Sequence, residues 1–108
     1  MYYTYMLRCQ DNSIYTGMTA DLERRMQEHF SGENNCAKYT NRHKPKKLEM
    51  AWECETRALA LKLEFHIKKD LTKLEKEDLI KNPKTLDTIF GEKIDYKLYK
   101  KVENLPKT

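Results

Sequence analysis

The carboxylate of Glu64 occupies a position at which an acidic side chain is costly. A helix is predicted over residues 57–70, with Thr56 as its N-cap. At about 100° per residue, one arc of this helix carries the apolar side chains Ala60, Leu63, Ile67 and Leu71. Glu64 falls inside the arc, on the face that packs against the fold, where a carboxylate needs a cationic partner or a metal ion. The residues alone leave two interpretations open, a structural ion pair and a functional site.

Basic residues gather in the segment KYTNRHKPKK, residues 38–47, which contains no acidic residue. Its cations are Lys38, Arg42, Lys44, Lys46 and Lys47. Tyr39 and His43 lie among them, and cations interleaved with aromatic side chains suit a nucleic-acid backbone. We therefore predict a loop that binds phosphates, the alternative being a loop that is simply solvated.

The elements that must position these residues begin with a β-hairpin over residues 2–18. Residues 2–9 alternate in polarity, residues 10–13 are turn formers, and residues 14–18 form a second short run. Gly17 lies inside that run, and a glycine within a strand often marks a bulge or a close approach of another group to the backbone. A third strand is predicted over residues 47–55, with one face buried and the other exposed. Its buried face would carry Leu48, Met50, Trp52 and Cys54.

Two further helices are predicted around the third strand. The first runs to residue 30 from an N-cap at Thr19 or Asp21, and its helical phase places Arg25 near the apolar stripe and Arg24 on the far side. The second follows residues 57–70, begins at a capping box from Thr72 to residue 75 and ends near residue 81. Residues 31–46 are expected to form a loop.

Length and composition exclude several classes of protein. A chain of 108 residues can close one hydrophobic core, and its 21 Lys and Arg are mixed with 17 Asp and Glu, so a single folded domain is expected. No apolar run approaches the roughly 20 residues of a membrane span, and the N-terminus lacks the pattern of a signal peptide. The three cysteines form no C-x-x-C pair, which argues against a disulfide framework or a zinc site. We expect a soluble, cytoplasmic protein without membrane contact.

One ordered set of residues is similar to the pattern of a known protein family. Tyr5 and Tyr15 lie ten residues apart on the two strands of the hairpin, Arg25 and His29 lie one turn apart on the next helix, and Glu64 follows on a later helix. Together with YTY at residues 3–5, YTG at residues 15–17 and the strings SIYTGMTADLERRMQEH and LEFHIKK, this set resembles the GIY-YIG nuclease superfamily. It is most similar to the small stand-alone bacterial branch, over roughly residues 1–82.

The resemblance implies an α+β fold with a three-stranded antiparallel β-sheet flanked by helices. Its elements would follow the order strand, strand, helix, strand, helix, helix. Residues 1–82 would form the nuclease domain, and residues 83–108 a C-terminal extension that is partly helical or frayed. The family's activity is metal-dependent hydrolysis of phosphodiester bonds.

The roles of individual residues are likewise what the resemblance implies. Tyr5 would be the general base, and Tyr15 would orient the attacking water or the phosphate. Arg25 would clamp the phosphate, and Glu64 would hold one Mg²⁺ or Mn²⁺ ion. An unperturbed tyrosine with a pKa near 10 is a poor base at neutral pH, so either nearby cationic charge favours its phenolate or a partner takes its proton as it acts. His29, one turn beyond Arg25, is the candidate partner.

The sequence thus predicts a small endonuclease that acts on nucleic acid, with DNA favoured over RNA. Branched, nicked and single-stranded DNA are candidate substrates, in DNA repair or recombination. A chain of this size has little room for a separate recognition domain, so loose specificity or action within a larger assembly is expected. The alternative is a non-catalytic nucleic-acid-binding module on the same scaffold.

Overall fold

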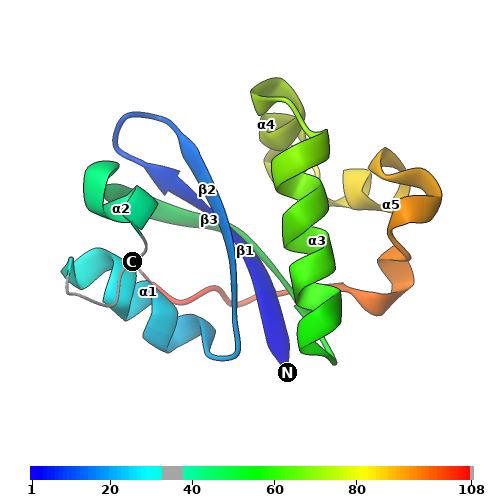
Figure 1. The fold of residues 1–108 in the computed structure, drawn as a ribbon, viewed down its shortest axis with the longest axis horizontal. Coiled ribbons are helices and arrows are strands. Elements are labelled where there is room, and N and C mark those ends of the chain that lie inside the picture. The colour runs from blue at the N-terminus through cyan, green and yellow to red at the C-terminus, as the bar shows by residue number, and fades with distance from the viewer. Residues whose placement is uncertain (33–37, 108) are drawn as a thin grey trace.

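Four strands form one antiparallel sheet in the computed structural model of the chain, which describes residues 1–32 and 38–107. The strands follow the spatial order β2, β1, β3, β4, so β2 is an edge strand (Figure 1). Their bounds are Tyr2–Cys9 for β1, Ile14–Thr19 for β2, Pro45–Cys54 for β3 and Lys100–Lys101 for β4. The α+β class predicted from the sequence is confirmed, with four strands instead of three. The two-residue strand β4 is too short to show any alternation of polarity.

The predicted hairpin is present and sets the geometry of the sheet edge. Strands β1 and β2 pair through residues that bring Tyr5 opposite Gly17 and Leu7 opposite Tyr15. Asn12 adopts the left-handed conformation with a φ of 71°, which a turn between two strands requires and an asparagine tolerates. Tyr5 and Tyr15 therefore lie on the same face of the sheet, one on each strand.

The third strand is buried on both faces, which corrects the prediction of one exposed face. Met6 pairs with Met50, but the next residue, Leu7, pairs with Leu48, so Glu49 forms a β-bulge. The bulge turns Leu48 to the opposite face from Met50. Because the pattern of β3 alone carries no sign of the bulge, the alternation assigned Leu48 to the wrong side.

Helices cover both faces of the sheet (Figure 1). On one face, α1 (Leu22–Ser31) packs apolar residues against β1 and β3, and the short helix α2 (Lys38–Arg42) lies beside it. On the other face lie α3 (Arg57–Asp70), α4 (Lys73–Lys81) and α5 (Leu86–Ile89). The side chains of Asp21, Thr56 and Thr72 cap α1, α3 and α4, as predicted for the starts of these helices. Residues 31–46 were expected to be a loop, and α2 is a correction to that expectation.

The C-terminal segment contributes to the core. It contains the short 3₁₀ turns Pro83–Thr85 before α5 and Gly91–Lys93 and Tyr96–Leu98 after it. Its buried side chains are Leu86, Phe90, Ile94 and Tyr99, which belong to the same cluster as the inner face of α3. Strand β4 then pairs with β3, and the following residues Val102 and Leu105 pack on the face covered by α1. The C-terminal segment thus packs on both faces of the sheet. The predicted boundary between a nuclease domain and a C-terminal extension at residue 82 stays a prediction.

Two of the three cysteines lie among the described residues. Cys9 and Cys54 are buried free thiols, and the third cysteine, Cys36, lies outside the described residues. Within residues 1–32 and 38–107, no helix is long and apolar enough to span a bilayer.

Candidate active site

A buried hydrogen bond joins the hairpin to α1. The Tyr5 hydroxyl oxygen lies 2.7 Å from Nε2 of His29, and each residue is only 1% exposed. Tyr5 comes from the middle of β1, and His29 comes from the last turn of α1, where the periodicity of the helix turns it toward the sheet. The packing of α1 thus holds an imidazole against a phenol.

The second ring nitrogen of His29 is also occupied. Its Nδ1 lies 2.8 Å from the hydroxyl oxygen of Thr40, a buried residue of α2. In the tautomer with its proton on Nδ1, His29 donates to Thr40 and accepts from Tyr5 at Nε2. The short helix α2 therefore determines how the imidazole is oriented.

Burial keeps both members of this pair neutral. Burial, followed by the positive charge of Arg25, lowers the pKa of His29 to about 4. Burial raises the pKa of Tyr5 above its usual range, although Arg25 opposes this through a hydrogen bond and its charge. At neutral pH, His29 is thus an unprotonated acceptor next to a protonated phenol.

Gly17, on the edge strand β2, leaves space for the side chains of Tyr5 and Tyr15. A Cβ atom at this position would lie 2.6 Å from the Tyr5 hydroxyl and 2.9 Å from a ring carbon of Tyr15, closer than real contacts. A side chain here would push the Tyr5 hydroxyl away from His29. Of the two interpretations of this glycine, a bulge or a close approach, the structure supports the close approach, and the approaching groups are the catalytic candidates themselves.

Aromatic rings extend from the buried pair to the surface. The ring of Tyr15 lies 5.5 Å from that of His29 and 5.4 Å from that of Tyr39, centroid to centroid. Tyr39 in turn stacks on His43 at 4.2 Å. These contacts attach α2 to the edge strand β2, and Tyr15, which is partly exposed, lies in the middle of the series.

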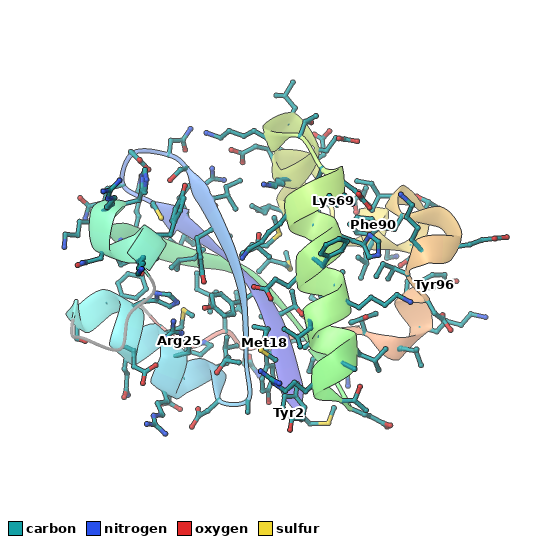
Figure 2. The ribbon with its side chains drawn as sticks, in the orientation of Figure 1. Tyr2, Met18, Arg25, Lys69, Phe90 and Tyr96 are labelled. Carbon is teal, nitrogen blue, oxygen red and sulfur yellow. The ribbon has the colours of Figure 1, made fainter. Side chains whose placement is uncertain are left out.

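The two neighbouring arginines of α1 point in different directions, as their helical phase predicted. The Arg25 side chain is 21% exposed, lies 2.9 Å from Glu28, and hydrogen-bonds to Tyr5. The Arg24 side chain is 73% exposed. Figure 2 shows Arg25 on the α1 side of β2, whereas Met18 lies toward α3.

Glu64 lies on α3, which covers the opposite face of the sheet from α1. Its side chain is 18% exposed, and its charge adds a small contribution to the raised pKa of Tyr5, after burial and the charge of Tyr15. One carboxylate oxygen lies 3.2 Å from the ammonium of Lys68, one turn further along α3. The ion pair expected as one interpretation of Glu64 is thus present, but its cation is half-exposed.

The Glu64 carboxylate suits a hard divalent cation that takes few ligands from the protein. Throughout the part of the chain that the structure describes, no three His, Cys, Asp or Glu side chains form a metal-binding group. A single carboxylate that already attracts an ammonium ion fits Mg²⁺ or Mn²⁺, since Mg²⁺ commonly takes one or two carboxylates and fills its other positions with water and substrate oxygens.

The predicted basic loop is divided between a helix and a strand. Lys38 and Arg42 lie on α2, where they line a surface hollow of about 500 Å³ together with Tyr39, Asn41 and His43. Lys46 and Lys47 lie on β3 and Lys44 precedes it, and Lys47 contacts Glu49 at 3.6 Å. All five cations are exposed, and Lys38 and Arg42 share their hollow with Tyr39 and His43 of the aromatic series.

The sequence missed two contributors to this cluster, Thr40 and Lys68. Thr40 was not a candidate because α2 was expected to be a loop, and Tyr39 was expected to lie among the cations of that loop, with no contact to Tyr15 foreseen. Lys68 was missed because its two contacts, Glu64 and Tyr15, combine residues from distant parts of the chain.

Comparison with known proteins adds independent findings. The family model described as the GIY-YIG catalytic domain matches residues 1–78. A UPF0213 protein of Fusobacterium nucleatum is 48% identical over 82 residues, covering 76% of this chain and 79% of its own. The UPF0213 protein YsiG of Lactococcus lactis is 36% identical over 104 residues, covering 96% and 94%.

Among solved structures, a UPF0213 protein from Bacillus halodurans, determined by solution NMR, is similar at 35% identity. It covers 84% of this chain and 98% of its own length, with a TM-score of 0.48. The names of these relatives specify no reaction, substrate or metal.

Proposed function

Because this chain belongs to the GIY-YIG family, as a small member with UPF0213 relatives, we propose that it is a metal-dependent endonuclease that hydrolyses phosphodiester bonds in DNA. The observation that carries the proposal is the hydrogen bond between Tyr5 and the neutral imidazole of His29. Packing alone would not require a histidine with a lowered pKa to face a tyrosine hydroxyl inside the fold.

In the proposed reaction, Tyr5 gives up its phenol proton as it takes another, instead of reacting as a preformed phenolate. Because its pKa is raised, a stable phenolate is costly at neutral pH. The phenol oxygen takes a proton from the attacking water while the phenol proton moves to Nε2 of His29. The water oxygen bonds to phosphorus, and the bond to the leaving oxygen breaks with its electron pair staying on that oxygen, which takes a proton from solvent water. His29 holds the proton displaced from Tyr5 and returns it to solvent before the next cycle.

The other residues stabilise charge around the reacting phosphate. Arg25 presents a planar guanidinium beside Tyr5, which suits two phosphoryl oxygens. Tyr15, the more exposed tyrosine, orients the water or the phosphate. Glu64 would hold Mg²⁺ or Mn²⁺, which when bound supplies a Lewis acid for the developing charge on the leaving oxygen.

The cations of α2 give the nucleic acid a path to this site. Lys38 and Arg42 flank the aromatic residues that lead to Tyr15, so a backbone lying along α2 would bring a phosphate toward Arg25. The exposed lysines at the start of β3 extend the positive surface. DNA is the proposed substrate, with branched, nicked or single-stranded forms as the candidates.

Incubation with a set of labelled nucleic acids tests the proposal. Single-stranded, duplex, nicked and branched DNA and matched RNA are incubated with Mg²⁺, Mn²⁺ or EDTA, beside the variant Arg25→Ala as a control for contaminating nucleases. The proposal expects metal-dependent cleavage of at least one DNA by the wild type alone. Tight binding without cleavage of any substrate would favour the binding module instead.

A further inference from the structure

Lys68 is a cation of this cluster to which neither the motif nor the proposed reaction gives a role. Its ammonium lies 3.2 Å from a carboxylate oxygen of Glu64 and 5.3 Å from the centroid of the Tyr15 ring. Glu64 is the proposed metal ligand and Tyr15 the proposed orienting residue. Lys68 thus contacts two functional candidates that are 49 residues apart in sequence.

The next residue on the helix provides an internal comparison. The ammonium of Lys69 lies 5.2 Å from the ring of Phe65, a residue that is 52% exposed on the outer surface of α3. Figure 2 labels Lys69 on α3, on the side toward Phe90 and away from β2. The two adjacent lysines therefore have the same charge and similar cation–π contacts, but only Lys68 faces the site.

The Lys68 ammonium and a divalent cation would compete for the Glu64 carboxylate. A divalent cation on the Glu64 carboxylate would repel an ammonium 3.2 Å from that carboxylate. The Lys68 side chain is 48% exposed, so it is free to move along its flexible stem. The Tyr15 ring offers it a second attractive surface at the edge of the sheet, opposite Arg25.

We propose that Lys68 is a phosphate-binding residue whose availability depends on the metal. Without a metal, its ammonium pairs with the Glu64 carboxylate. A metal ion bound by Glu64 releases the ammonium, which then binds a phosphate oxygen of the substrate beside Tyr15. The inference rests on the proposed function, because it takes Glu64 as the metal ligand. Arg25 from α1 and Lys68 from α3 would then hold the substrate from the two sides of β2. Lys68 thereby couples substrate binding to metal binding.

The first test measures metal binding alone. Mn²⁺ is titrated into the full chain and followed by electron paramagnetic resonance for the wild type, Lys68→Gln, Lys69→Gln and Glu64→Gln. Lys68→Gln should bind Mn²⁺ about two- to fivefold more tightly, the range that loss of an exposed ion pair allows. Lys69→Gln should equal the wild type, and Glu64→Gln should lose the site.

The second test measures phosphate contacts with and without metal. Binding of a nuclease-resistant phosphorothioate single strand is followed by fluorescence anisotropy at several salt concentrations, in Mn²⁺ and in EDTA. Lys68→Gln should lower the slope of log affinity against log salt by roughly 0.7 in Mn²⁺, as one lost contact predicts, and leave it unchanged in EDTA. Lys68→Arg should restore the slope in Mn²⁺.

The outcomes separate this inference from the proposed function. If Glu64→Gln loses Mn²⁺ but Lys68→Gln binds it as the wild type does, the inference is overturned and the proposed function stands. An equal loss of slope in Mn²⁺ and in EDTA also overturns the inference, because Lys68 would then bind phosphate without release from Glu64. If Glu64→Gln binds Mn²⁺ like the wild type, the metal assignment fails and both proposals fall.

Discussion

The hydroxyl of Tyr5 and Nε2 of His29 lie 2.7 Å apart, and each of the two residues is 1% exposed. Burial affects the two groups of this pair in opposite ways, and both effects determine whether the tyrosine can act as a base. Burial makes Tyr5 a poor base, because it raises the pKa of the phenol, and the same burial makes His29 an available acceptor, because it lowers the pKa of the imidazole. A tyrosine can therefore act as a base here only by passing its own proton to the histidine.

Removal of the Tyr5 hydroxyl should abolish most of the cleavage. Tyr5→Phe keeps the ring in the core but leaves Nε2 of His29 without a partner, at a cost of about 1–3 kcal/mol in stability. Cleavage should fall by about 10²- to 10⁴-fold, as loss of a general base does. Rates of cleavage and urea denaturation measure the two effects on the same protein.

Tyr99→Phe is the matched control for this change. Tyr99 is also a buried tyrosine, and its hydroxyl donates to the carbonyl oxygen of Leu59 at 2.6 Å, away from the site. The control should lose similar stability but keep its cleavage rate. Equal rates for Tyr5→Phe and Tyr99→Phe would show that the Tyr5 hydroxyl has no part in the reaction.

The lowered pKa of His29 predicts how stability depends on pH. The group has a pKa of about 4 when folded and 6.5 ordinarily, so the unfolded chain binds more protons between these values. The free energy of unfolding should rise by up to about 3 kcal/mol from pH 4 to pH 6.5 on account of His29, and this contribution should stay constant above pH 6.5.

Urea denaturation from pH 4 to pH 8 tests this dependence. His29→Gln cannot titrate, so its stability should change less with pH across the window than that of the wild type. Cleavage by the wild type should also decline as the pH falls toward 4, because a protonated His29 cannot accept the proton of Tyr5. Parallel stability curves for the wild type and His29→Gln would contradict the assigned pKa.

The two arginines of α1 should differ sharply in mutagenesis. Arg25→Ala should abolish cleavage with the fold intact, and Arg25→Lys should recover little, because lysine lacks the planar fork that holds two oxygens. Arg24→Ala removes the same charge from a side chain that is 73% exposed and should cost little. Circular dichroism and cleavage rates compare the three variants, and equal losses for the two alanine variants would refute the assignment.

The cations of α2 should contribute to binding rather than to chemistry. Lys38→Ala with Arg42→Ala should weaken DNA binding and reduce the slope of log affinity against log salt by roughly 0.7–0.9 for each lost contact. Lys84→Ala with Lys97→Ala removes the same charge from exposed positions in the C-terminal segment and should leave the slope unchanged. Equal slopes for both pairs would exclude α2 from the binding surface.

Local patterns were sufficient to predict most of the fold. The hairpin follows from alternation and turn formers, and the capping residues Asp21, Thr56 and Thr72 mark the starts of three helices as the structure has them. The bulge at Glu49 could not be predicted, because it depends on how β3 pairs with β1. Helix α2 is a single turn without an apolar repeat, and β4 has only two residues.

The candidate site was predicted in a different way. The helical phase separated Arg25 from Arg24 and identified Glu64 as a carboxylate that needed a partner. Tyr5 and Tyr15, in contrast, look like ordinary sheet residues, and only the resemblance to a family made them candidates. Lys68 carries no signal in the sequence, because its role depends on where α3 lies against β2.

Glu64→Gln tests the central claim, that this site hydrolyses phosphodiester bonds with a metal held by Glu64. The change keeps the size of the side chain and removes its charge, and it leaves only the half-exposed Lys68 without its partner, so thermal stability should stay near that of the wild type. The decisive measurement is the rate of cleavage of labelled DNA in Mn²⁺ by the wild type and by folded Glu64→Gln. A fall of several orders of magnitude in the rate, with DNA binding retained or tightened, is the result expected. A folded Glu64→Gln protein that cleaves at the wild-type rate would contradict the claim.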